Sequence, residues 1–101
     1  MPAFGFTKMD KYKNIIAQCE VAIKGVKSIL SAEEYSECID YVLKHNEWLL
    51  GLEFAIDWII EDDRKIDQKS FKEFEKAYNL MDLPFDDRLK DLKEQINERK
   101  N

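Results

Sequence analysis

The chain has 101 residues, of which 45% are hydrophobic and 37% are charged, and its formal net charge is -5. This length and composition indicate one globular domain over residues 1–101 rather than a disordered chain. The acidic excess argues against direct binding of DNA or RNA, because a surface that contacts phosphates carries lysine and arginine.

The negative charge is concentrated in one segment of the chain. Residues 31–63 contain ten aspartates and glutamates, a single lysine, Lys44, and no arginine. The segments before and after it carry a small positive excess. We therefore expect the acidic segment to favour a basic partner protein, because opposite charges accelerate encounter and fix orientation.

The sequence predicts a cytoplasmic protein. Its first residues, MPAFGFTKMDKYK, lack the apolar segment of a signal peptide, and no apolar run has the length of a membrane span. Cys19 and Cys38 fall on the apolar faces of predicted helices, where a free cysteine packs as a small hydrophobic residue. A disulfide between them is disfavoured in the cytoplasm.

Two helices are predicted in the first half of the chain. Apolar residues recur at three- and four-residue spacing from about Lys8 to Leu30, which indicates one amphipathic helix. Ser31 and Glu34 have the spacing of a capping box and begin a second helix. The expected core residues of these two helices are Tyr12, Ile15, Ile16, Cys19, Ala22, Ile23, Val26, Ile29, Leu30, Tyr35, Cys38, Ile39, Val42 and Leu43.

Three further helices complete the prediction. Asn46 is expected to cap a third helix that ends near Asp62. A fourth helix begins at Asp67, or at Ser70 with Glu73 in a second capping box, and a last helix follows Pro84. Their expected inward residues are Phe71, Phe74, Ala77, Tyr78, Met81, Phe85, Leu89, Leu92 and Ile96. The fold class is therefore all-α, a compact bundle of four to five helices with short connections.

The third helix has two unlike faces. One face is apolar and is expected to lie in the core; it consists of Trp48, Leu49, Leu52, Ala55, Ile56, Ile59 and Ile60. On the other face, one row of residues spaced by four is Leu50, Phe54 and Trp58, and a second is Glu53, Asp57 and Glu61. Neighbouring carboxylates destabilise a helix by a few tenths of a kcal/mol per pair. Because the helix has no lysine or arginine, we expect cations from another helix or from a partner.

Two interpretations of this face are open. Phe54 and Trp58 could pack beneath the first or fourth helix, with lysines of the first helix near the carboxylates. Alternatively, the aromatic residues anchor a partner protein and the carboxylates contribute association rate and specificity. The candidate residues of this binding surface are Glu37, Asp40, Glu47, Leu50, Glu53, Phe54, Asp57, Trp58 and Glu61. A homodimer could use the same residues.

No catalytic or cofactor-binding constellation is found in the sequence. The only histidine, His45, falls at a predicted helix junction, where it is expected to cap or pack. The three glycines are scattered, and the paired cysteine and histidine spacings of zinc sites and the Glu-x-x-His pairs of carboxylate metal bundles are missing. Asp62 and Asp63 are expected to be solvated or to extend the acidic surface. We therefore expect a protein without enzymatic activity, metal or cofactor.

Residues 41–61, YVLKHNEWLLGLEFAIDWIIE, resemble the central motif of bacterial immunity proteins of the MafI type, which have relatives in contact-dependent growth inhibition. The motif comprises a helix junction, His45-Asn46-Glu47, followed by Gly51-Leu52-Glu53 and by Asp57 and Glu61. Residues 66–83 resemble the next helix of the family. The likeness covers roughly the middle half of the chain. Two features depart from the pattern of the family. Gly51 stands where alanine is expected, and the first helix is long and basic.

The resemblance implies an immunity protein that binds the C-terminal nuclease domain of a secreted toxin and neutralises it. The toxins of this family are often RNases, including the EndoU type. The acidic helical face would then cover the basic active-site region of the toxin and exclude RNA. The alternative is a helical adaptor or regulatory subunit that binds a basic partner unrelated to toxins.

Overall fold

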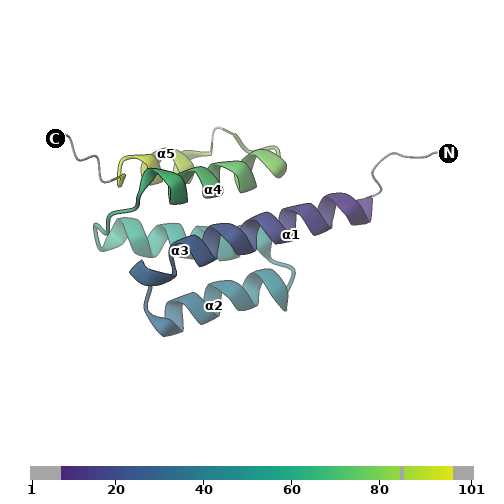
Figure 1. Cartoon of the computed structure of the whole chain (residues 1–101), viewed down its shortest axis with the longest axis horizontal. Helices are drawn as coiled ribbons and strands as arrows, with labels where there is room; N and C mark the ends of the chain where they lie inside the picture. The colour runs from purple at the N-terminus through teal and green to yellow at the C-terminus, as the bar shows by residue number, and fades with distance from the viewer. Residues whose placement is uncertain (1–7, 85, 97–101) are drawn as a thin grey trace.

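The structure, a computed structural model, describes residues 8–84 and 86–96 and confirms an all-α bundle (Figure 1). Phe85 of the predicted last apolar face lies outside these residues. The described elements are α1 (Lys8–Gly25), a 3-10 helix η1 (Lys27–Ile29), α2 (Ala32–Leu43), α3 (Trp48–Glu61), α4 (Gln68–Leu80) and α5 (Asp87–Lys93). A parallel bridge joins Ile66 to Ile96.

The helices form three layers. In Figure 1, α4 and α5 lie at the top, α1 and α3 in the middle and α2 at the bottom. Helix α1 packs mainly on α4, while α2 packs mainly on α3. Helix α5 bridges α3 and α4, so α3 has α2 along one side and α5 along the other. In the described part of the chain, no helix is both long and apolar enough to cross a membrane.

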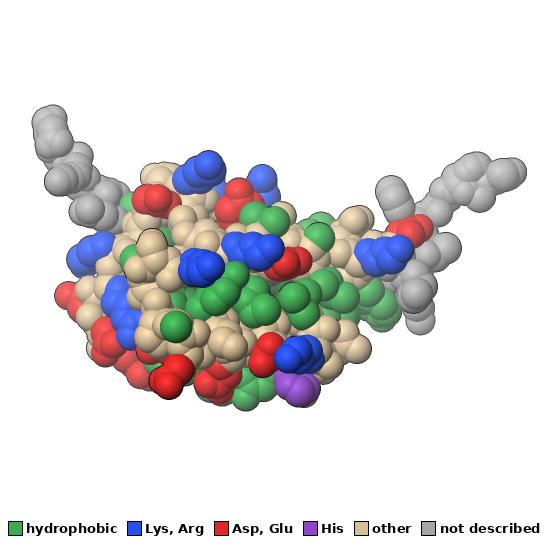
Figure 2. All heavy atoms as spheres, turned by 60° about the horizontal axis from the view of Figure 1, so that its bottom comes forward, with side chains coloured by type: hydrophobic (Ala, Val, Ile, Leu, Met, Phe, Trp, Pro, Cys, Tyr) green, Lys and Arg blue, Asp and Glu red, His purple; other side chains and the backbone are tan. Residues whose placement is uncertain are grey.

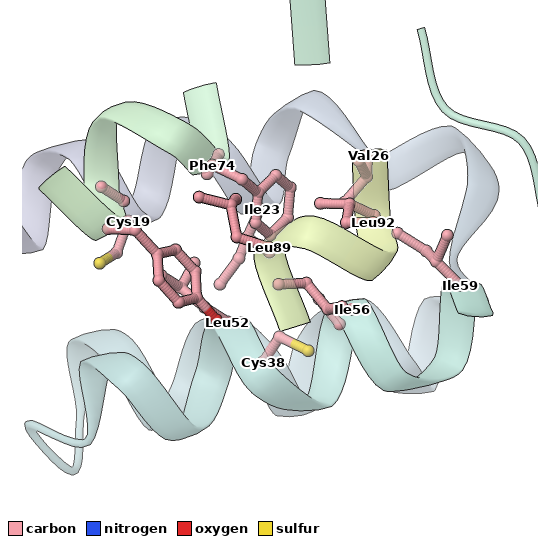
Figure 3. Packing of buried hydrophobic residues seen from close by; sticks show 14 of the residues in the cluster. Cys19, Ile23, Val26, Cys38, Leu52, Ile56, Ile59, Phe74, Leu89 and Leu92 are labelled. Carbon is pink, nitrogen blue, oxygen red and sulfur yellow. The ribbon is translucent and has the colours of Figure 1, made fainter. Parts of the chain in front are cut away.

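All five α-helices contribute side chains to one core, shown in Figure 3. Ile23, Cys38, Ile56, Phe74 and Leu92 represent α1 to α5 in turn, and each is fully buried. No polar or charged residue is buried within the described ranges. Burying apolar surface contributes roughly 25 cal/mol per Å², so this shared core is the main source of stability.

Both cysteines lie in this core as free thiols, as the sequence predicted. Cys19 and Cys38 have no exposed surface. Burial raises the pKa of each thiol to about 12, because the thiolate would lose its hydration. Each therefore packs as a neutral hydrophobic side chain.

Local hydrogen bonds define the starts of three helices. Ser31 and Glu34 form the predicted capping box, with the Glu34 N–H donating to Ser31 Oγ at 3.0 Å and the Ser31 N–H to Glu34 Oε1 at 2.8 Å. Asp67 caps α4 by accepting from the Ser70 N–H at 2.7 Å, which selects the first of the two predicted starts. Asp86 caps α5 in the same way.

Two predicted helix boundaries were wrong. Helix α1 ends at Gly25 instead of Leu30. Glycine is a poor helix former, and the Gly25 carbonyl accepts a hydrogen bond from Ser70 Oγ at 3.2 Å. Asn46 does not cap α3; it has a positive φ of 55°, which asparagine tolerates better than most residues. Glu47 takes the N-cap position without a side-chain cap.

Two predicted core residues are instead exposed. Tyr12 is 43% exposed because the first turns of α1 extend beyond the neighbouring helices (Figure 1), and its ring centroid lies 5.3 Å from that of Trp48. Leu43 is 47% exposed at the last position of α2, where the chain already turns toward α3.

Candidate protein-binding surface

Three aromatic side chains form a continuous stack across α2 and α3, and two of them, Phe54 and Trp58, also pack against the core. The ring centroids of Tyr41 and Phe54 are 5.2 Å apart, and those of Phe54 and Trp58 are 5.6 Å apart, each pair at an interplanar angle of 24°. All three residues are half-buried. We call Tyr41, Phe54 and Trp58 the aromatic row. The stack fixes each ring, so little side-chain entropy remains to be lost on binding.

Gly51 allows α2 and α3 to approach closely enough for this stack. A Cβ atom on Gly51 would lie 2.9 Å from the Cys38 carbonyl oxygen and 2.9 Å from Val42 Cγ2. Both distances are shorter than a van der Waals contact, so only glycine fits without displacement. Tyr41 contacts the same side of the helix, 3.4 Å from that position, and its ring is thereby brought against Phe54.

The cation beside Glu53 and Asp57 comes from α5 and not from the lysines of the first helix. Arg88 donates from Nε to Asp57 Oδ1 at 3.0 Å and from Nη2 to Asp57 Oδ2 at 3.3 Å. Its Nη1 is 3.3 Å from Glu53 Oε2. The hydrogen bond with Asp57 is the main reason that the pKa of Arg88 is raised. Both carboxylates are therefore paired within the chain, although one guanidinium leaves the group with a net charge of -1.

The other candidate carboxylates are available to solvent. Glu37, Glu47 and Glu61 are exposed and form no ion pair within residues 8–84 and 86–96. Asp40 lies 3.5 Å from Lys44, whose side chain is 70% exposed. Exposed pairs of this kind contribute little free energy and can be exchanged for another partner. The predicted surface thus consists of Glu53 and Asp57, which share Arg88, of Asp40 beside the exposed Lys44, and of carboxylates that have no ion pair among the described residues, namely Glu37, Glu47 and Glu61.

An open hollow of about 500 Å³ lies along α2 beside the aromatic row. Its lining consists of Ala32, Glu33, Ser36, Glu37, Asp40, Tyr41 and His45. Figure 2 shows acidic side chains gathered along the lower part of the molecule, where α2 lies, with the histidine at one end. Tyr41 belongs to both the hollow and the aromatic row, so the two features form one continuous surface.

Leu50, which the residue spacing predicted on the same face of α3 as Phe54, is half-buried. Tyr41, His45 and Arg88 also border this surface and were not predicted from the sequence. His45 is exposed, and its ring lies 5.9 Å from that of Tyr41. The carboxylates of α3 indicated that a cation from elsewhere was needed, but no local sequence pattern identifies α5 as the helix that supplies it.

Asp62 and Asp63 are exposed, as expected, but each is paired locally. Asp62 pairs with Arg64, and Asp63 Oδ1 accepts from Lys65 Nζ at 3.3 Å and from Gln95 Nε2 at 3.0 Å. Arg64 also binds Glu34 at 2.7 Å. These two aspartates consequently stabilise the end of α3 and add little free negative charge to the binding surface.

The part of the chain that the structure describes contains no group of three or more histidine, cysteine, aspartate or glutamate side chains that could hold a metal ion.

No protein-family model, curated protein or solved structure matches the chain.

Proposed function

We propose that the chain is an immunity protein that binds and neutralises a bacterial toxin domain, with a ribonuclease as the target. The observation that carries the proposal is the aromatic row of Tyr41, Phe54 and Trp58 beside carboxylates that form no ion pair with any residue the structure describes. Half-buried aromatic residues supply binding energy at the centre of protein interfaces, and surrounding charges supply rate and orientation.

The sign of the charge favours a nuclease as partner. An active site that holds RNA phosphates is positively charged, so an acidic surface is attracted to it and competes with RNA for the same cations. Glu37 of α2 and Glu61 of α3 are exposed acidic residues that would face this cleft. The likeness of residues 41–61 to immunity proteins of the MafI type supports the same proposal.

An inhibition assay tests the proposal. The purified protein is titrated into the toxin domain encoded by the adjacent gene, and RNA cleavage is followed. We expect cleavage to fall linearly to zero at one equivalent. Full cleavage at an excess of the protein, with no complex by size-exclusion chromatography, would contradict the proposal and favour a helical adaptor for another basic protein.

Matched variants then locate the surface. Glu37→Gln with Glu61→Gln removes two free carboxylates from the proposed surface, and we expect inhibition to require more protein. Asp91→Asn with Glu94→Gln removes the same charge from exposed positions at α5 and its C-cap. This control pair should inhibit as the unchanged protein does.

A further inference from the structure

We propose that the hollow on α2 binds an arginine side chain of the partner, stacked on the ring of Tyr41 and hydrogen-bonded by Glu37 and Asp40. This inference rests on the proposed function insofar as it takes the partner to be a basic protein. It goes further by naming the group that is recognised and the place where it binds.

The lining of the hollow defines the chemistry of its occupant. Glu33, Glu37 and Asp40 present carboxylates from successive turns of α2, and Tyr41 supplies an aromatic ring. A cation with an apolar, planar face satisfies both kinds of group at once. Guanidinium has this shape: it stacks on aromatic rings and donates two parallel hydrogen bonds to one carboxylate. A lysine ammonium forms the ion pair without the stacking.

Tyr41 is held in position before any partner arrives. Its ring stacks on Phe54, and Phe54 in turn stacks on Trp58. An arginine entering the hollow would extend this row by one member. Because the ring is already fixed, stacking does not require further ordering of Tyr41.

Two carboxylates of the hollow are free to accept a cation, and the third, Asp40, is paired only with the exposed Lys44, at 3.5 Å, which an incoming arginine can displace. Glu33 and Glu37 are exposed and have no ion pair among the described residues. On the other side of α3, Arg88 already forms ion pairs with Asp57 at 3.0 Å and with Glu53 at 3.3 Å. An incoming arginine therefore finds carboxylates available on α2. The pair of Arg88 and Asp57 is an example, within the chain, of the guanidinium–carboxylate contact that we propose for the partner.

Peptide titrations followed by NMR test this inference. The probes are capped hexa-arginine and hexa-lysine peptides of equal charge, added to the isotopically labelled protein at low salt. We expect the arginine peptide to bind tighter by about threefold or more, since stacking adds to charge attraction. Amide shifts should be concentrated in residues 33–45. Equal affinities, or shifts centred on α5, would overturn the inference.

Two variants separate stacking from charge. Tyr41→Leu should abolish the preference for arginine while both peptides still bind, whereas Tyr35→Leu, on another side of α2 beside Lys27, should retain the preference. If Tyr41→Leu fails to fold, Glu37→Gln with Asp40→Asn provides the test, and both peptides should then bind more weakly. Unchanged affinity in this double variant would overturn the inference.

The peptide and inhibition experiments fail independently. A protein that inhibits the toxin but shows no arginine preference retains the proposed function and loses only the arginine site. A protein that prefers arginine at α2 but does not inhibit the toxin retains the site and loses the toxin as its partner.

Discussion

Arg88 of α5 donates two hydrogen bonds to the carboxylate of Asp57 on α3, at 3.0 and 3.3 Å. This contact joins the last described helix to the central one and divides the acidic surface into two parts. Glu53 and Asp57 on the α5 side are held by Arg88, whereas Glu37 on the α2 side has no ion pair among the described residues.

Arg88→Ala should therefore destabilise the fold while leaving the α2 side unchanged. Removing the guanidinium leaves Glu53 and Asp57, both half-buried, without a counter-charge. Because Arg88 is 42% exposed, we expect a loss of about 1 kcal/mol in the free energy of unfolding. Urea denaturation measures it, with Lys90→Ala, an exposed change on the same helix, as control. Equal stability of the two variants would contradict the structural role of Arg88.

Gly51→Ala should destabilise the protein although alanine favours helices. The new Cβ would lie 2.9 Å from the Cys38 carbonyl oxygen, so α2 and α3 must separate. Overpacking of this kind costs roughly 1–3 kcal/mol, against a gain of about 1 kcal/mol in helix propensity. In Gly25→Ala the nearest atom is Ser70 Oγ at 3.6 Å, an ordinary contact, and we expect no loss of stability. Thermal unfolding of the two variants should differ in this order.

Acid should weaken the junction between α2 and the end of α3. Hydrogen bonds from Arg64, followed by that from the Ser31 N–H, lower the pKa of Glu34 from 4.5 to about 2 in the folded protein. A lowered pKa means that this stabilisation is complete above about pH 4.5 and disappears as the pH falls toward 2. We expect a contribution of about 2 kcal/mol, since the Glu34 side chain is only 19% exposed.

The pH dependence of unfolding checks this contribution. Glu34→Gln should be less stable than the unchanged protein at pH 7 and should approach it in stability near pH 2. A constant difference between the two proteins over this range would show that the charge of Glu34 is not responsible.

Trp58→Ala should weaken toxin binding more than any loss of fold stability explains. Trp58 ends the aromatic row, and truncating an aromatic anchor at an interface costs roughly 2 kcal/mol or more, or about thirtyfold in affinity. Leu80→Ala removes a 40% exposed apolar side chain from α4 and serves as the control. Calorimetric titration with the toxin domain should separate the two variants. Equal affinity would place the binding centre elsewhere.

The parts of the fold that depend on local sequence were predictable. The Ser31 capping box, the Asp67 cap and the spacing of core residues such as Phe74 and Ile56 are each specified within a few residues. Asn46 was assigned the wrong role because a cap and a left-handed turn residue favour the same amino acid.

The arrangement of the surface was only partly predictable. The spacing of Phe54 and Trp58 placed them on one face of α3, but their stacking with Tyr41 depends on how closely Gly51 lets α2 approach. Arg88 lies 31 positions from Asp57, and no periodicity relates the two residues. Contacts between helices depend on which helices become neighbours, which this sequence does not specify locally.

The most direct test of the account is the association rate of the toxin domain with the protein, measured by stopped flow at low and high salt. Glu37→Gln with Glu61→Gln should lower the rate several-fold at low salt, and the difference should shrink as salt screens the charges. The control pair Asp91→Asn with Glu94→Gln should associate as the unchanged protein does. Equal rates for both pairs at low salt would contradict the claim that the free carboxylates of α2 and α3 guide the partner.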